Sequence, residues 1–159
     1  MKSVQAVYAW LQTRYPGRVH RPRTHVFAGR PGHHYLVPAP DSAAAAHELM
    51  AAISALSANA EASLVRLNDA FVVTIARAST VSDPVTVPRR TVGISRFEWL
   101  AHTHPVELES RYGVAPNLPT QSDVDALTKV NHIWGQETST IVVCGAGEVL
   151  EVVHFSVDG

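Results

Sequence analysis

Residues 100–125 read LAHTHPVELESRYGVAPNLPTQSDVD, with His102 and His104 on either side of one threonine and Pro105 directly after them. On a β-strand, residues two apart point to the same face and lie roughly 6.5–7 Å apart at the backbone. Two imidazoles at that spacing can bind one metal ion, at about 2.0–2.1 Å each for zinc. We therefore predict a strand that ends near Pro105 and a Zn²⁺ ion held by both histidines.

The end of the same segment supplies a candidate third ligand. Ser122 can cap a helix, and Asp125 falls in its first turn three residues later. The helix is expected over residues 122–134, with Val124, Leu127, Val130 and Trp134 facing inward. His102, His104 and Asp125 would leave the fourth tetrahedral position to water, which is the coordination of a catalytic zinc site.

The rest of the chain alternates between helical and extended patterns. Val4, Val7, Tyr8, Leu11 and Tyr15 recur at helical spacing before Pro16-Gly17, and the alanine-rich stretch predicts a second helix over residues 42–57. Strands are expected at residues 33–37, 61–67, 70–78, 91–104, 139–145 and 148–157, with a hairpin-like break at Asn68-Asp69. A change in apolar phase between Ile94 and Phe97 predicts a β-bulge.

This order of elements predicts an α/β or α+β fold with a central mixed β-sheet flanked by helices. A length of 159 residues fits one domain, spanning residues 1–159. Within it, residues 1–40 are expected to form an N-terminal helix and an extension rich in Pro, Gly and His.

The composition argues against a nucleic-acid or membrane partner, because the formal net charge is only −1 and no apolar stretch reaches the length of a membrane span. The basic run at residues 18–30 is interpreted as a solvated loop. The single cysteine, Cys144, allows no intrachain disulfide and fits a reducing compartment, so a cytoplasmic location is predicted, with secretion as a toxin as the alternative. The composition does not predict an oligomeric state.

HTHP followed by PTQSDVD resembles the signature of the bacterial JAMM, or MPN-plus (JAB), zinc metalloproteases: a distant glutamate, His-x-His-Pro, then Ser-x-x-Asp. The pattern falls on His102, His104, Pro105, Ser122 and Asp125. The resemblance implies that the two histidines and the aspartate bind Zn²⁺, and that Ser122 forms a hydrogen bond near the oxyanion. It also implies a mixed sheet between helices, with cytidine-deaminase-like layering. The two parts of the motif are separated by an enlarged loop, residues 105–121, which would border the substrate groove.

In the family a glutamate acts on the metal-activated water. Glu61 is the candidate for this general base, because it follows the alanine-rich helix and opens a strand. Glu48 and Glu98 are the alternatives, although Glu98 lies about 13 Å from His102 along the same strand. The resemblance thus implies a zinc metallopeptidase that hydrolyses a peptide or isopeptide amide, with a protein or peptide substrate such as a ubiquitin-like conjugate.

Other interpretations of the same residues remain open. The chain could be a catalytically inactive MPN-type scaffold, or a JAB-like polymorphic toxin domain. A cupin could use His102, His104 and Glu109, with His132 or His154 as a third histidine, but the two predicted helices do not belong in a jelly roll. An amidohydrolase barrel needs about 250 residues and is excluded by length.

Overall fold

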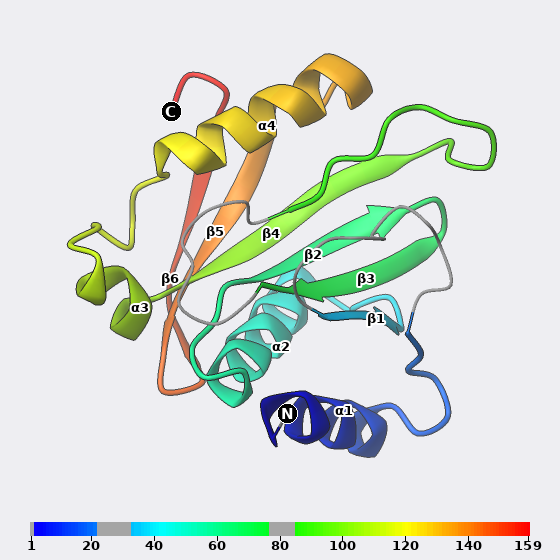
Figure 1. Ribbon diagram of the computed structural model, residues 1–159, viewed down its shortest axis with the longest axis vertical. Coiled ribbons are helices and arrows are strands. Elements are labelled where there is room, and N and C mark those ends of the chain that lie inside the picture. Colours follow the sequence, from blue (N-terminus) through cyan, green and yellow to red (C-terminus); the bar gives the residue numbers. More distant parts are fainter. Residues whose placement is uncertain (1, 22–32, 77–84) are drawn as a thin grey trace.

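A six-stranded mixed sheet runs through the centre of the computed structural model, which describes residues 2–21, 33–76 and 85–159 (Figure 1). Its strands are β1 (His33–Val37), β2 (Ala62–Leu67), β3 (Ala70–Ile75), β4 (Phe97–Pro105), β5 (Thr138–Gly145) and β6 (Glu148–Ser156). Their order in space is β1-β3-β2-β4-β5-β6. Only β4 and β5 pair in parallel; the other neighbours are antiparallel.

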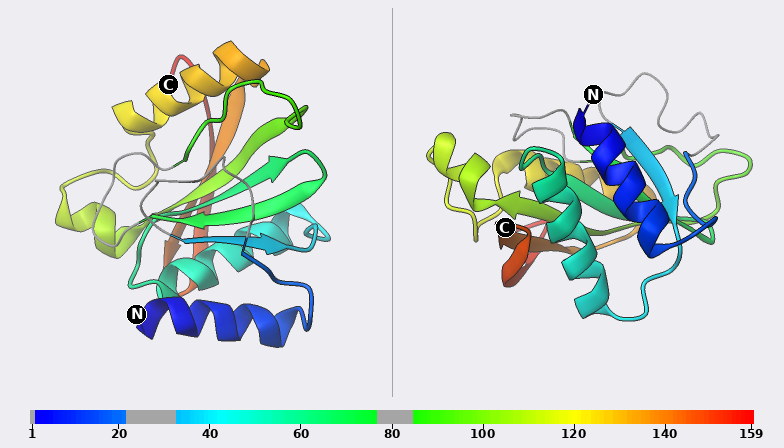
Figure 2. Two further views of the ribbon diagram at one scale, coloured as in Figure 1. Left: turned by 45° about the vertical axis from the view of Figure 1, so that its right-hand side comes forward. Right: turned by 90° about the horizontal axis from the view of Figure 1, so that it is seen from below.

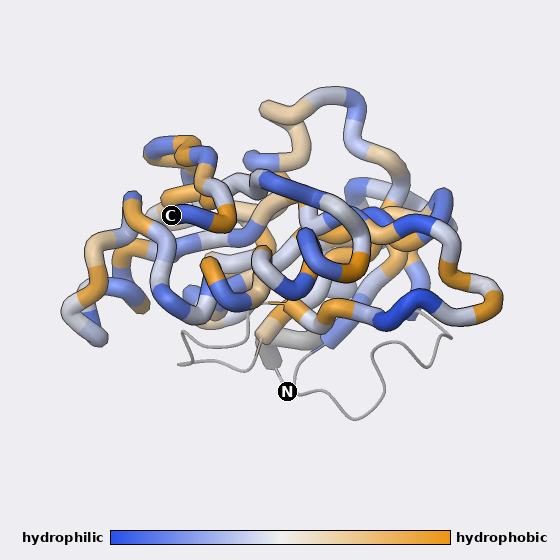
Figure 3. The backbone as a smooth tube through the Cα atoms, turned by 90° about the horizontal axis from the view of Figure 1, so that it is seen from above, coloured by the Kyte–Doolittle hydropathy of each residue, from blue (hydrophilic) through white to orange (hydrophobic). Residues whose placement is uncertain are grey.

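Helices cover both faces of this sheet (Figures 1 and 2). On one face, α2 (Ala43–Leu56) packs against β2, β4, β5 and β6. The helix α1 (Lys2–Arg14) packs against α2 and, through Tyr8, against Tyr35 of β1. Leu11, Leu49, Ile53, Leu64 and Val73 belong to the core on this face. On the other, α4 (Gln121–Trp134) packs through Leu127 and Val130 against Val65, Trp99 and Ile141. Hydrophobic and hydrophilic residues alternate over short intervals along the chain (Figure 3). The central strands β2 and β4 are buried along most of their length, as a sheet covered by helices on both faces requires. The predicted α+β class with a central mixed sheet and flanking helices is confirmed.

Locally determined elements lie where the sequence predicts them. The helix expected at residues 42–57 is α2, whose N-cap Ser42 accepts a hydrogen bond from the Ala45 amide at 3.0 Å. Asn68 adopts a left-handed conformation with φ 55° between the antiparallel strands β2 and β3, which confirms the predicted break. The N-terminal helix is also present, with Val7 and Leu11 fully buried.

The strand expected at residues 91–104 differs from the prediction. It begins only at Phe97, since Thr91 and Ile94 form an isolated bridge in a turn. The β-bulge lies elsewhere: Leu64 pairs with Ala101 and Val65 with Trp99, so the residue between Trp99 and Ala101 has no partner on β2. The bulge prediction between Ile94 and Phe97 is therefore wrong.

A short helix, α3 (Val106–Arg111), occupies the start of the segment predicted to be loop. It packs against the turn between β5 and β6, where Glu107 Oε1 accepts a hydrogen bond from the Ala146 amide at 3.1 Å. A Cβ on Gly145 would come within 2.9 Å of Val106 Cγ2. The enlarged loop is thus anchored to the sheet beside the end of β4.

Two predictions fall partly outside the described residues: most of the basic run at residues 18–30 and the last residues of the strand expected at 70–78. Among the helices that are described, none combines the length and apolar character needed to cross a membrane.

Candidate metal centre

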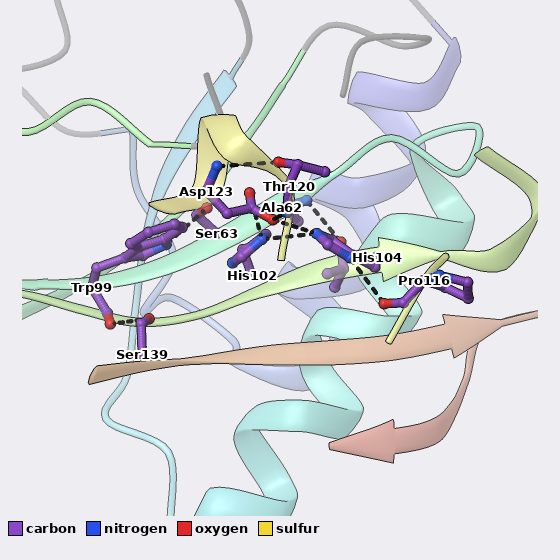
Figure 4. A network of polar contacts seen from close by, with 10 residues as sticks. Ala62, Ser63, Trp99, His102, His104, Pro116, Thr120, Asp123 and Ser139 are labelled. Carbon is purple, nitrogen blue, oxygen red and sulfur yellow. Dashed lines mark hydrogen bonds and ion pairs between the residues drawn. The ribbon is translucent and has the colours of Figure 1, made fainter. Parts of the chain in front are cut away.

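The two histidines of the HTHP motif lie side by side on β4, in the middle of the sheet. His102 is paired with Ser63 on β2 and with Ile141 on β5, and His104 with Val143 on β5. Because they are two residues apart on a strand, both rings project to the face that α4 covers. Their Nε2 atoms are 3.0 Å apart, and both side chains are fully buried (Figure 4).

Asp123, in the first turn of α4, completes this cluster. Its Oδ1 lies 3.1 Å from His102 Nε2 and its Oδ2 lies 3.0 Å from His104 Nε2, and the side chain is fully buried. The start of the helix holds it there: Thr120 Oγ1 accepts a hydrogen bond from the Asp123 amide at 3.1 Å, while the Thr120 amide donates to Asp123 Oδ2 at 2.9 Å. This reciprocal capping box fixes the carboxylate against the histidines (Figure 4).

His102 Nε2, His104 Nε2 and the Asp123 carboxylate face one another, and their lone pairs require a positive charge between them. The Nδ1 of His104 is 2.9 Å from the Pro116 carbonyl, which can only accept, so Nδ1 carries a proton. In neutral His104 the Nε2 atom then presents a lone pair to the Asp123 carboxylate. A proton on His102 Nε2 could satisfy one of these contacts, whereas the contact between His104 and Asp123 needs either a second proton on His104 or a metal ion between the two groups.

A tetrahedral metal ion fits this donor set. Ligands about 2.0–2.1 Å from zinc at tetrahedral angles are about 3.4 Å from one another, close to the observed separations of 3.0–3.1 Å. The hydrogen bond from His104 Nδ1 to Pro116 is the outer contact that commonly orients a metal-binding imidazole. Behind His102, the Trp99 ring stacks at 4.7 Å between centroids and closes the site on that side.

The pKa values in the cluster follow from burial and from these contacts. Burial alone would raise the pKa of Asp123, but His102 and then His104 outweigh it, so the pKa of this carboxyl lies far below its ordinary value. For His104 burial acts to lower the pKa, yet the hydrogen bond to Asp123 and its charge raise it overall. For His102 burial prevails and lowers the pKa. Asp123 is therefore a carboxylate, the form that binds a cation.

Glu61 lies beside this cluster at the entry to β2. One of its oxygens lies within 4.8 Å of a nitrogen of His102 and of His104, and the residue is 3% exposed. Among the described residues, its Oε2 has no hydrogen-bond partner. Burial, followed by the negative charges of Glu109 and Asp123, raises its pKa well above the ordinary value. Glu61 therefore lies beside the same two histidines that Asp123 contacts.

The structure brings Glu61, His102 and His104 together as predicted, but it does not bring Asp125 to them. Asp125 is exposed and its Oδ1 accepts a hydrogen bond from Gln121 Nε2 at 2.9 Å. Two residues along a helix correspond to a rotation of about 200°, so Asp123 and Asp125 point in nearly opposite directions. The placement of Asp125 in the ligand set is corrected to Asp123.

Ser122 is likewise displaced from its predicted position, because α4 is capped by Thr120 and not by Ser122. Ser122 is half-buried and lines a surface pocket together with Asp125, Val87 and Lys129. The sequence did contain the signal: Thr120-x-x-Asp123 has the same spacing as Ser122-x-x-Asp125. Asp123 also shares the i, i+4, i+7 stripe of the buried Leu127 and Val130.

The other candidates lie away from the centre. Glu48 is exposed on α2, and Glu98 forms an ion pair with Arg96 near the start of β4. His132 and His154, the candidate third ligands of a cupin, are both exposed. The open sheet with helices on both faces also excludes the jelly roll that a cupin requires.

Glu109 on α3 is a third buried carboxyl group near the end of β4. The sequence suggested it as a ligand only if the protein were a cupin. Glu109 is fully buried, and neither of its oxygens has a hydrogen-bond partner within residues 2–21, 33–76 and 85–159. Burial raises its pKa; the charge of His104 acts in the opposite direction, and the charge of Asp123 raises the pKa further.

Comparison with known proteins finds no matching family model, and neither the curated proteins nor the solved structures include a match.

Substitutions of Thr120 and Ser122 should have different effects, because Thr120 belongs to the capping box of α4 and Ser122 does not. Thr120→Val should destabilise the protein by about 1 kcal/mol, the usual cost of losing an N-cap hydroxyl. It should also weaken zinc binding about tenfold, because the helix start that positions Asp123 loses the hydrogen bond from the Asp123 amide to the Thr120 hydroxyl, although the Thr120 amide still donates to the carboxylate. Ser122→Ala is the matched control and should leave zinc binding unchanged in competition titrations with a zinc chelator, because Ser122 is not part of the capping box. Weaker zinc binding in Ser122→Ala than in Thr120→Val would contradict this account of the helix start.

Proposed function

We propose that this protein is a zinc-dependent metallopeptidase that hydrolyses a peptide or isopeptide amide bond. The observation that carries the proposal is the convergence of His102 Nε2, His104 Nε2 and the Asp123 carboxylate within 3.0–3.1 Å, with a further carboxyl group beside them. Two imidazoles and one carboxylate are the ligand count of a catalytic zinc site. The resemblance of HTHP and the following helix start to the JAMM signature supports the same class, with Asp123 in the position of its aspartate.

In this proposal His102, His104 and Asp123 hold Zn²⁺, which would act as a Lewis acid and lower the pKa of water in its coordination shell. The Pro116 carbonyl keeps the proton of His104 on Nδ1, so that Nε2 stays free to bind. Glu61 accepts a proton from the attacking water on a carboxylate oxygen and then delivers it to the nitrogen of the leaving amine. Its raised pKa suits a group that must hold a proton between these two steps.

A second candidate function follows from the burial of the cluster. Both histidines and Asp123 are fully buried, and Glu61 is 3% exposed. If Glu61 were a fourth ligand, the site would be closed, as in structural zinc sites. The protein would then be an MPN-type interaction module stabilised by a metal ion, without peptidase activity. The two candidates assign different roles to Glu61 and can be separated there.

The proposed activity can be tested with the full chain loaded with one equivalent of Zn²⁺. We expect cleavage of isopeptide-linked or linear fluorogenic substrates built on a ubiquitin-like tail, loss of cleavage with 1,10-phenanthroline, and recovery when Zn²⁺ is returned. Cleavage that survives complete removal of the metal would show that another mechanism operates. Zinc-loaded protein that cleaves neither substrate type would favour the structural metal site.

A further inference from the structure

The two histidines of the metal centre are held in different ways. The Nδ1 atom of His104 lies 2.9 Å from the Pro116 carbonyl, whereas the Nδ1 atom of His102 is buried without a hydrogen-bond partner among the described residues. A metal-binding imidazole is usually oriented by a hydrogen bond at its other ring nitrogen. For His102, aromatic contacts take this place. The Trp99 ring stacks on the imidazole with 4.7 Å between centroids and 25° between planes, and Phe155 packs nearly perpendicular to it at 5.9 Å.

Trp99 is held by side chains on both of its strand neighbours. Its ring is fully buried, and its Nε1 donates a hydrogen bond to Ser63 Oγ on β2 at 3.3 Å. Its backbone lies just before the bulge of β4, and the parallel pairing of β4 with β5 begins only at His102. The backbone of Trp99 therefore needs side-chain partners on the β5 side. One of them is Ser139, whose Oγ donates to the Trp99 carbonyl at 2.8 Å (Figure 4).

Gln136 is the second of these partners. It directly follows Gly135, the left-handed C-cap of α4 with φ 79°. The Trp99 amide donates to Gln136 Oε1 at 2.8 Å, and Gln136 Nε2 donates to the Trp99 carbonyl at 2.7 Å. Nε2 also donates to the Thr138 carbonyl at 2.8 Å, at the start of β5. Because a primary amide has the donor and the acceptor of a peptide group, Gln136 takes the place of a paired strand residue beside Trp99.

We propose that Gln136 is a positioning residue of the metal centre, which acts through Trp99 on the orientation of His102. Gln136 fixes the Trp99 backbone, and the stacked Trp99 ring sets the plane of the His102 imidazole. The connection after α4 thus joins the helix that supplies Asp123 to the strand that supplies the histidines. The inference rests on the metal site of the proposed function and does not depend on peptidase activity.

The test compares Gln136→Met with Glu137→Gln in the full chain. Methionine is similar in length to glutamine but lacks the amide group, and Glu137 is the exposed neighbour. In competition titrations with a zinc chelator, Gln136→Met should bind Zn²⁺ about tenfold more weakly than the wild type, the usual effect of losing an outer contact of a metal site. Glu137→Gln should bind Zn²⁺ as the wild type does.

The visible absorption spectrum of bound Co²⁺ distinguishes a positioning role from a purely structural one, because its bands depend on the arrangement of the ligands. The spectrum should change in Gln136→Met and in Trp99→Leu. It should stay close to that of the wild type in Trp99→Phe, which keeps an aromatic ring beside His102. Circular dichroism without metal shows which variants are folded. If Trp99→Leu does not fold, Gln136→Met and Trp99→Phe still provide the comparison.

The outcomes separate this inference from the proposed function. A Gln136→Met variant that is less stable, yet binds Zn²⁺ and Co²⁺ as the wild type does, would overturn the positioning role and leave the metal site intact. A Trp99→Phe spectrum as altered as that of Gln136→Met would show that stacking does not orient His102. A wild type that binds no ion would refute the metal site and this inference together. Zinc binding with the expected variant effects but without cleavage would support the inference and refute the peptidase alone.

Discussion

Asp123→Ala is expected to abolish zinc binding, whereas Asp125→Ala should bind zinc as the wild type does. Asp123 contacts both histidines from a fully buried position, so its removal takes away one of three donors. The affinity should fall by at least about 100-fold, since even outer contacts of a metal site are commonly worth 10–100-fold. Asp125 is exposed and contacts Gln121 only through a surface hydrogen bond, so its loss should change stability by no more than about 0.5 kcal/mol.

The pair of variants makes this comparison stringent, because both remove an aspartate from the first two turns of α4. Zinc content after gel filtration, measured by elemental mass spectrometry, gives the result directly. Circular dichroism should show that Asp123→Ala remains folded. Loss of zinc from Asp125→Ala with retention in Asp123→Ala would restore the ligand set that the Ser-x-x-Asp spacing predicts and refute the geometry described here.

Glu61→Gln should retain the zinc ion and lose peptidase activity. The amide cannot accept a proton, and general acid–base catalysis commonly contributes about 10²–10⁴-fold to the rate. Because Gln has the shape of Glu, packing around the entry to β2 should be preserved. The values to compare are kcat on a cleavable substrate and the dissociation constant for zinc.

The same variant decides between the two candidate functions. If Glu61 is a fourth ligand in a closed structural site, Glu61→Gln should weaken zinc binding and lower the melting temperature of the zinc-loaded protein. Glu98→Gln is a suitable control, since Glu98 lies on the sheet but pairs with Arg96. Full activity in Glu61→Gln would show that Glu61 is not the base.

The elements that could be predicted from the sequence are those that depend on interactions between residues close together in the chain. The capped, alanine-rich α2 and the hairpin at Asn68 depend on residues within a few positions of one another. The convergence of His102 and His104 is also local, because alternation along a strand places both rings on one face. The helix α3 could not be found in this way, since contacts with the β5–β6 turn hold it and these come from residues far along the chain.

The error over the aspartate has a definite cause. Two overlapping helix starts, Thr120-x-x-Asp123 and Ser122-x-x-Asp125, satisfy the same local rule, and a shift of two residues turns the carboxylate to the opposite side. Packing in the core determines which helix start is used. Leu127 and Val130 face the sheet, and Asp123 lies on the same side of the helix. The buried stripe of α4 therefore indicates Asp123 as the metal ligand, whereas the identity of the capping residue does not distinguish Asp123 from Asp125.

The proposed metal ion would lie between β4 and the first turn of α4. A crystal structure of the zinc-loaded protein, with anomalous diffraction measured on both sides of the zinc absorption edge, would locate it. We expect a strong anomalous peak about 2.0–2.1 Å from His102 Nε2, His104 Nε2 and an oxygen of Asp123. A peak coordinated by other residues, or no peak at this position in zinc-saturated crystals, would contradict this placement of the ion.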